Sequence, residues 1–264
     1  MHLLTRRAPA STKTRLLLLA ALLFAGTLRA AETVSVAAAA NLVHALEALN
    51  AEFRKQAPEV AVTSTSGASG SLLAQIRNGA PFDVFLSADT DYPKQLVAAG
   101  AGDAATLRTF ATGRLVFWTT RTDLAVTDPA ATVRHATVKK IAIAQPRTAP
   151  YGRAAQTALE KLGAWTDAQP KIVFGENITQ TAQFVETGNA DAGFVALSLV
   201  LSSRLANKGK WTEVPVTLYG VGTLDHAGVL TNRGATNPAA KRYLDFLASD
   251  AAKKIFRDFG YQVP

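Results

Sequence analysis

The feature that most constrains the fold is the alternation of short strand-like runs with amphipathic helical segments along nearly the whole chain. The run 33–40 is rich in valine and alanine, and Leu42, Leu46 and Leu49 then recur at helical spacing. The same change of pattern follows at 60–65 and again several times downstream. Such alternation indicates α/β units built on a mostly parallel sheet.

The pattern predicts where the individual elements lie. Strands are expected at 33–40, 60–65, 83–88, 114–120, 139–146, 171–177, 191–197, 213–224 and 226–231. Helices are expected at 41–58, 72–80, 91–100, 153–164, 178–188 and 239–260, the last with a break near Ser249. No proline-rich or charged tether divides the chain, so two domains would be joined by strands, and 114–120 and 214–220 are the predicted crossings.

The first thirty residues read as a secretory signal peptide. Residues 1–15 are basic and contain no acidic residue, and 16–30 include an apolar run shorter than the ~20 residues that span a bilayer. Cleavage is expected after Ala30. The alternative, a transmembrane anchor, is disfavoured by the length of the run.

Removing this leader changes what the charge implies. It carries five of the 28 basic residues, which leaves 23 against 20 acidic residues in the mature chain. The small remaining excess gives no support to nucleic-acid binding. The chain has no cysteine, so neither disulfides nor a lipid-anchored cysteine is expected.

Residues that could carry catalysis are sparse. His44, His135 and His226 lie outside any metal-ligand spacing, and each is expected to be a structural histidine. No nucleophile elbow, zinc motif or phosphate loop occurs. Asp89 and Asp91 are expected to cap the following helix rather than to hold a cation.

Small or polar residues recur where a strand ends and a helix begins. The junctions are marked by Asn41, Ser69, the pair Tyr151 and Gly152, and the pair Asn177 and Ile178. A helix start leaves backbone N–H groups without intrahelical partners and carries the positive end of the helix dipole. Several starts at one edge of a parallel sheet would therefore form an anion site. Taken singly, Asn41 and Ser69 are ordinary N-cap residues, and Tyr151 and Ile178 are ordinary packing residues.

The mature chain resembles the periplasmic molybdate-binding proteins of ABC importers over about 33–261. The matching stretches are VAAAANL, SGASGSLLAQI, NGAPFDVFLSAD, LEKLGAW and IFRDFGY. This resemblance implies an α/β, two-lobed type II periplasmic binding fold, in which each lobe is a mostly parallel sheet flanked by helices and two strands cross between them. The predicted lobes are 31–114 with 222–264, and 115–221.

The resemblance also implies roles for the junction residues. Asn41 and Ser69 match ligand-binding positions of the first lobe, Tyr151 a position of the second lobe, and Ile178 a backbone donor. Several family members have a ligand-binding tyrosine where this chain has Ala196. Our hypothesis is that the Tyr151 hydroxyl replaces it.

The implied function is capture of molybdate or tungstate by hydrogen-bond donors only, in a cleft that holds no catalytic residue, cofactor or metal ligand. The implied partner is a membrane permease, and the protein is expected to be periplasmic and monomeric. Two alternatives stay open: a receptor for sulfate or an organic anion, the latter held by Arg153, and an exported hydrolase using Ser69. The hydrolase lacks an evident base to activate the serine.

Overall fold

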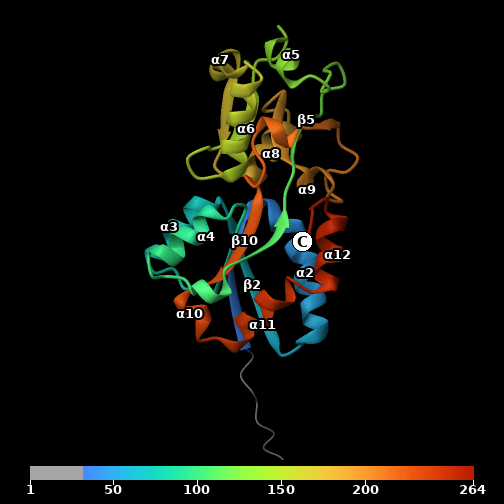
Figure 1. The fold of residues 1–264 in the computed structure, drawn as a ribbon. Coiled ribbons are helices and arrows are strands. Elements are labelled where there is room, and N and C mark those ends of the chain that lie inside the picture. Colours follow the sequence, from blue (N-terminus) through green and yellow to red (C-terminus); the bar gives the residue numbers. More distant parts are fainter. Residues whose placement is uncertain (1–31) are drawn as a thin grey trace, which may run out of the picture. The chain divides into compact units, whose positions relative to one another are not determined.

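The structure, a computed structural model, describes residues 32–264, and the predicted signal peptide lies outside them. The described part contains two five-stranded sheets with helices packed against them (Figure 1). The α/β two-lobed prediction is therefore confirmed. Among the described helices, none combines the length and the apolar character that a membrane crossing requires.

The first sheet has the strand order β2-β1-β3-β10-β4. Strands β1, β2 and β3 are parallel, whereas β10 runs antiparallel to both β3 and β4. The bounds are β1 (Glu32–Ala39), β2 (Val60–Gly67), β3 (Val84–Ser87), β4 (Arg108–Thr112) and β10 (Asp225–Leu230). Because β1 lies inside the sheet, its second half is fully buried, as its valine and alanine run predicts.

The second sheet repeats the arrangement, with the order β7-β6-β8-β5-β9. Strands β7, β6 and β8 are parallel, and β5 runs antiparallel to β8 and β9. The bounds are β5 (Leu115–Thr119), β6 (Ile141–Ala144), β7 (Ile172–Gly175), β8 (Ala192–Ala196) and β9 (Lys210–Glu213).

The helices that pack on these sheets begin mostly where the sequence predicts. Those of the first lobe are η1 (Ala40–Leu42), α2 (Val43–Gln56), α3 (Ser69–Arg77), α4 (Asp91–Ala98), η2 (Ala104–Thr106), α10 (Asn232–Ala235), α11 (Pro238–Phe246) and α12 (Asp250–Asp258). Those of the second lobe are α5 (Pro129–Arg134), α6 (Pro150–Lys161), α7 (Trp165–Ala168), η3 (Gln169–Lys171), α8 (Ile178–Glu186), α9 (Leu197–Val200) and η4 (Val216–Leu218). The predicted break near Ser249 is confirmed, because its hydroxyl caps α12 by accepting from the Ala252 amide at 3.2 Å.

The chain passes between the sheets twice. It leaves the first sheet after β4 through Gly113 and returns through the segment that leads into β10. The prediction of a strand at 213–224, and with it of a crossing strand at 214–220, is wrong. After β9 the chain forms the turn η4 and then two glycine turns, with φ of 100° at Gly220 and 80° at Gly222. Pro215 and these glycines disfavour an extended strand, although the valines and tyrosine of this stretch suggested one.

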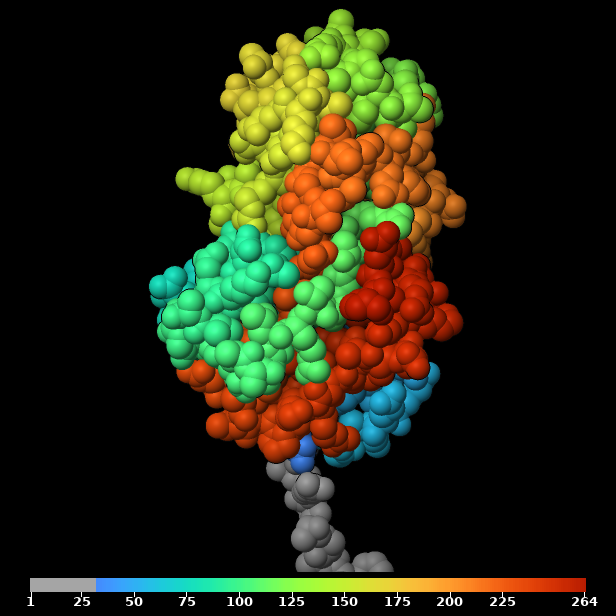
Figure 2. All heavy atoms as spheres, viewed as in Figure 1, coloured from blue at the N-terminus to red at the C-terminus, as the bar shows by residue number. Residues whose placement is uncertain are grey.

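The two crossings lie next to each other and to the C-terminal residues. The Gly113 amide donates to the Leu224 carbonyl at 2.9 Å, and Thr112 exchanges two backbone hydrogen bonds with Gln262. Figure 2 shows the segment around residue 110 beside the C-terminal residues on one face. The C-terminal segment thus reaches the junction of the lobes, where Tyr261 is buried.

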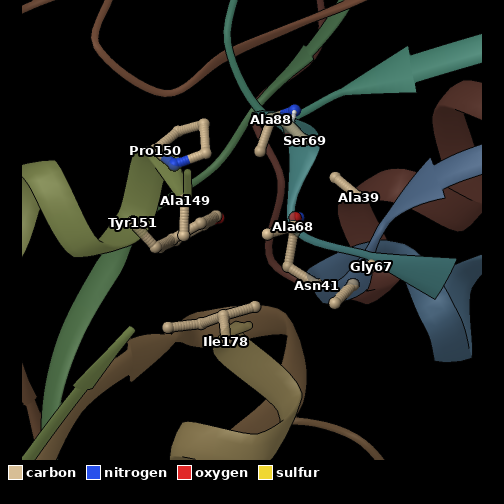
Figure 3. A pocket seen from close by; sticks show the side chains of 11 residues that line it. Ala39, Asn41, Gly67, Ala68, Ser69, Ala88, Ala149, Pro150, Tyr151 and Ile178 are labelled. Atoms are coloured by element: carbon tan, nitrogen blue, oxygen red, sulfur yellow. Dashed lines mark hydrogen bonds between the residues drawn. The ribbon is translucent and has the colours of Figure 1, made fainter. Parts of the chain in front are cut away.

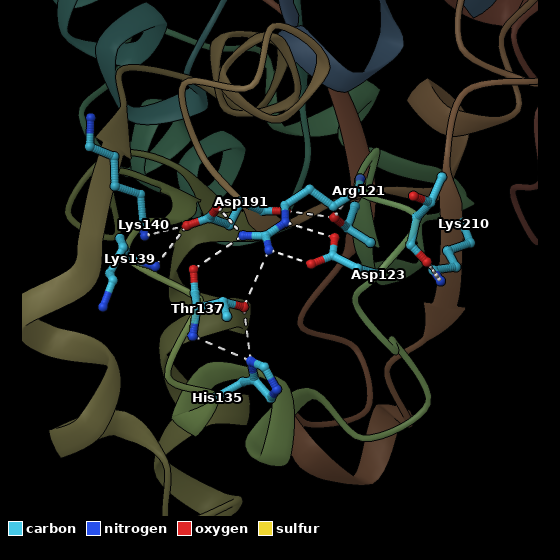
Figure 4. A network of polar contacts seen from close by, with 10 residues as sticks. Arg121, Asp123, His135, Thr137, Lys139, Lys140, Asp191 and Lys210 are labelled. Atoms are coloured by element: carbon cyan, nitrogen blue, oxygen red, sulfur yellow. Dashed lines mark hydrogen bonds and ion pairs between the residues drawn. The ribbon is translucent and has the colours of Figure 1, made fainter.

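A separate polar network fixes the connection from β5 to β6 in the second lobe (Figure 4). The Arg121 guanidinium donates to Asp123, Asp191 and Thr137, and the second Asp191 oxygen accepts from the Lys139 and Lys140 amides at 2.7 and 2.9 Å. Hydrogen bonding to Arg121 lowers the pKa of Asp123. Because these donors and acceptors pair with each other, we interpret the network as structural.

Candidate functional site

Four helix starts surround one small cavity between the two sheets (Figure 3). The starts are those of η1, α3, α6 and α8, and each follows the carboxyl end of a strand in its own lobe. The cavity volume is about 10 Å³, close to the room that one water molecule needs. All four junction residues of the sequence analysis line it: Asn41, Ser69, Tyr151 and Ile178.

The capping of these helices leaves donors around the cavity. Ala39, Ala68 and Ala149 occupy the N-cap positions of η1, α3 and α6, and none provides a side-chain cap. Asn177 does cap α8, but its oxygen accepts from the amides of Thr179 and Gln180 rather than from that of Ile178. Apart from Gly70, whose amide donates to the Thr148 carbonyl at 2.9 Å, the first-turn amides therefore have the character of an anion site, with the positive dipole ends of the helices beside one cavity.

Ser69 contributes a hydroxyl to the same place. The residue is 1% exposed, and its Oγ accepts a hydrogen bond from the Ala88 amide at 3.1 Å. This contact uses a lone pair and leaves the hydroxyl hydrogen available for donation. Among the described residues no histidine, lysine or carboxylate contacts this hydroxyl, so Ser69 is not arranged as an activated nucleophile.

Asn41 forms hydrogen bonds with three residues that were not predicted to belong to the site. Its Nδ2 lies 2.7 Å from His226 Nε2 and 2.8 Å from the Tyr261 hydroxyl. The Ser198 hydroxyl donates to its backbone carbonyl at 3.0 Å. The side-chain oxygen of Asn41 is buried without a hydrogen-bond partner in the described protein.

Tyr151 reaches toward the same region from α6 (Figure 3). Its hydroxyl is buried, has no hydrogen-bond partner among residues 32–264, and lies so close to Gly113 that a Cβ there would overlap it. Burial raises the pKa of the phenol well above its usual value, so the group stays protonated and able to donate. Two unpaired polar atoms, on Asn41 and Tyr151, thus belong to cavity-lining residues of opposite lobes.

Ala196 ends β8 and is fully buried. It has no polar side chain, so it provides no hydroxyl. The prediction that His226 is a structural histidine is confirmed, because its ring is buried and both nitrogens have partners, but one of these partners, Asn41, is a cavity residue. The only sequence signal for this was the position of His226 at the start of the returning strand.

A charged contact, which we call the closure contact, joins the lobes beside the cavity and consists of Asp89, Tyr92 and Arg153. Arg153 forms an ion pair with Asp89 and donates to the Tyr92 hydroxyl at 2.9 Å. Burial raises the pKa of Asp89, although hydrogen bonds from the Tyr92 amide and Ser87 and the charge of Arg153 act in the opposite direction. Arg153 is therefore occupied by protein groups and does not line the cavity.

The closure contact also accounts for one of the predicted helix caps. Asp89 Oδ1 accepts from the Tyr92 amide at 3.1 Å, in the first turn of α4, as the sequence analysis expected. Within residues 32–264 no group of three acidic, histidine or cysteine side chains is placed to hold a metal ion. Among the described residues that line the cavity, none carries a charged side chain.

The matches to a family model and to curated relatives indicate the same protein family. Residues 34–262 match the family model for bacterial extracellular solute-binding proteins. The molybdate-binding protein ModA of Azotobacter vinelandii is 39% identical over 90% of this chain and 93% of its own length. ModA of Rhodobacter capsulatus is 40% identical over 88% and 89%.

Solved structures agree with the sequence comparisons. The periplasmic molybdate-binding protein of Azotobacter vinelandii superposes with a TM-score of 0.81 at 32% identity, covering 88% of this chain and 99% of that one. The sulfate-binding protein SubI of Mycobacterium tuberculosis gives a TM-score of 0.68 at 15% identity, covering 88% and 87%. The second likeness concerns the fold alone.

Proposed function

This chain belongs to the bacterial extracellular solute-binding proteins, and we propose that it captures molybdate or tungstate for an ABC importer. The observation that carries the proposal is a cavity surrounded by four helix starts. None of the described residues that line this cavity has a charged side chain. The relatives named as molybdate-binding proteins supply the chemical class of the ligand.

The cavity chemistry supports a fully ionised oxyanion. Backbone amides at helix starts, together with the Ser69 hydroxyl, offer donors that need no counter-charge. Such donors stabilise an anion well when they are fixed in place and shielded from water. We propose that Asn41 and Ser69 bind from the first lobe, and the Tyr151 hydroxyl and Ile178 amide from the second.

Binding is expected to work by closure of the lobes, without a covalent step. A tetrahedral oxyanion is larger than a water molecule, so it needs somewhat more room than the cavity volume of about 10 Å³. We expect the lobes to part for entry and then to close around the anion. Contact with both lobes favours the closed arrangement, since a ligand shifts an equilibrium only by binding one state better.

Selectivity would follow from protonation and size. A protonated phosphate brings an O–H that meets donors rather than an acceptor, so its binding is disfavoured. Sulfate is fully ionised but smaller, and would make looser contacts. Molybdate and tungstate have nearly the same size, so both are expected to bind.

The biological setting follows from the family. We propose that residues 1–30 direct export to the periplasm, that the mature protein works as a monomer, and that the closed form docks on a membrane permease. The organic-anion alternative loses its support because Arg153 pairs with Asp89 and Tyr92. The hydrolase alternative loses its support because Ser69 has no base beside it in the described protein.

Calorimetric titration of the mature protein with molybdate, tungstate, sulfate and phosphate tests this proposal. We expect saturable binding of molybdate and tungstate at micromolar concentration or below, with sulfate and phosphate at least about a hundredfold weaker. Binding of sulfate as tight as molybdate, or of none of the four anions, would contradict it.

A further inference from the structure

The His226 ring lies behind the cavity, and its surroundings determine the protonation of each nitrogen. The residue is fully buried. Its Nδ1 lies 2.8 Å from the Leu224 carbonyl, which can only accept, so Nδ1 carries a hydrogen. In a neutral ring Nε2 is then an acceptor, and the group 2.7 Å away must donate to it. That group is the Nδ2 of Asn41.

This assignment fixes the direction of the Asn41 side chain. Its amide nitrogen donates one hydrogen to His226 Nε2 and the other to the Tyr261 hydroxyl oxygen. The amide oxygen is left buried and unpaired in the described protein. An oxygen acceptor repels an oxyanion, so in this arrangement the Asn41 side chain opposes the ligand that the neighbouring amides attract.

Reversing the Asn41 amide would present its nitrogen to the ligand, and two neighbours would have to adapt. The Tyr261 hydroxyl donates to the Asn41 backbone carbonyl at 2.9 Å, and it would have to redirect this hydrogen to the amide oxygen while Ser198 continues to donate to the carbonyl. His226 Nδ1 must keep its hydrogen for Leu224, so Nε2 can face an oxygen only if it gains a hydrogen of its own. The ring would then be an imidazolium.

We propose that His226 is a positioning residue for the oxyanion: it takes up a proton as the anion binds and so turns the Asn41 nitrogen toward the ligand. The proton comes from solvent and bonds to Nε2, and the ring charge changes from zero to +1. This inference rests on the proposed function. It places one buried positive charge behind a cavity whose described lining has none, close to a bound dianion.

The groups that face His226 are compatible with protonation of the ring. Strand β4 contributes Phe110, α6 contributes Tyr151, and the C-terminal segment contributes Tyr261. Both tyrosines are buried, and burial raises the pKa of each phenol, so neither carries charge. On its own strand, Asp225 is the acidic neighbour and is hydrogen-bonded by the Thr112 hydroxyl at 2.7 Å.

The direction of the pH dependence follows. Burial lowers the pKa of His226 to about 4, so the ring is neutral near pH 7 without ligand, although Asp225 and Leu224 act in the opposite direction. A dianion at the cavity raises this pKa. Between the two values each unit of decreasing pH strengthens binding, by up to about tenfold. Above the higher value the ring is neutral with and without ligand, so affinity no longer changes with pH through His226.

Nitrogen-15 NMR of the imidazole rings tests the protonation directly on the wild-type mature protein. We expect His226 to change from the neutral Nδ1–H form to the doubly protonated form when sodium molybdate or sodium tungstate is added at pH 6. His44 and His135 serve as internal references that do not change. A His226 ring that stays neutral in the saturated complex overturns the inference.

Calorimetry from pH 5.5 to 8, in buffers of different ionisation enthalpy, gives a second measure. Wild type should take up close to one proton per tungstate at the lower pH values, and His226→Gln should lose both the uptake and the pH slope. His135→Gln, in the distal Arg121 network, is the matched control and should keep the wild-type slope. If His226→Gln folds and retains that slope, the inference is wrong.

These experiments separate the inference from the function on which it rests. Tight binding of molybdate with a pH-independent affinity and no proton uptake would leave the proposed function intact and remove the role of His226. Absence of binding at every pH would remove both. If His226→Gln does not fold, the NMR result on wild type decides.

Discussion

The two regions that join the lobes, the cavity and the closure contact, use opposite chemistry. The cavity is lined by described residues with uncharged side chains and by helix starts, whereas the closure contact is an arginine paired with a carboxylate. Arg153 is 37% exposed at its side chain and Asp89 is 4% exposed. A free arginine inside the cavity would attract many anions, while amides fixed in space select by shape and protonation. Side-chain charge at the lobe surfaces therefore stabilises the contact between the lobes, whereas the residues that line the cavity offer the ligand only dipoles and hydrogen-bond donors.

The largest effect is expected from placing a charge in the cavity. Ser69→Asp adds a carboxylate beside the position proposed for the dianion, and like charges a few ångströms apart repel by several kcal/mol. We expect molybdate affinity to fall by at least about a thousandfold. Ser69→Ala, which loses one hydrogen bond to a charged group, should cost about ten- to a hundredfold. Calorimetry measures both, and an aspartate variant that binds like the alanine variant would refute the uncharged-cavity interpretation.

A smaller loss is expected from Gly70→Ala, which tests whether the lobes must approach closely. The Gly70 amide donates to the Thr148 carbonyl across the cleft at 2.9 Å. A Cβ at this position would lie 2.6 Å from the Tyr92 hydroxyl oxygen and 3.1 Å from the Thr148 Cα. Such overpacking costs about 1–3 kcal/mol, so affinity should fall by about five- to 150-fold.

The control for Gly70→Ala is Gln75→Ala, an exposed position on the same helix, which should bind like wild type. Small-angle scattering of the ligand-saturated proteins adds a structural measure. We expect Gly70→Ala to show a larger radius of gyration than wild type. Equal radii together with equal affinities would mean that the lobes do not press together at Gly70.

The two regions also differ in how much of each could be predicted from the sequence. The α/β order and the four cavity residues followed from strand-to-helix junctions, because the carboxyl ends of parallel strands gather at one edge. The neighbours His226, Tyr261 and Ser198 did not follow, since they come from a returning strand, the chain end and a short helix. No local pattern relates such distant segments, and the ion pair of Asp89 with Arg153 was hidden for the same reason.

Removing the charge of the closure contact should have a moderate effect. Arg153→Ala leaves the buried Asp89 carboxylate without its cation, but hydrogen bonds from Ser87 and from the Tyr92 amide remain. Partly exposed ion pairs contribute about 1 kcal/mol, so we expect molybdate affinity to fall by about five- to tenfold. Loss of all binding would instead favour a receptor in which Arg153 holds an organic anion, and the lobe contact interpretation would be abandoned.

The smallest effect is expected from Tyr151→Phe. This variant distinguishes a role of the Tyr151 hydroxyl in ligand binding from a role in folding. The Tyr151 hydroxyl has no partner in the described protein, so its removal should leave thermal stability unchanged or slightly higher. If the hydroxyl donates to the anion, the loss of one hydrogen bond, about 0.5–1.5 kcal/mol, lowers affinity by roughly two- to tenfold. Calorimetry and thermal unfolding of the same sample test both parts. An affinity within about twofold of wild type would mean that Tyr151 binds through its backbone amide alone, and an unpaired hydroxyl would then remain beside Gly113 without a function in binding.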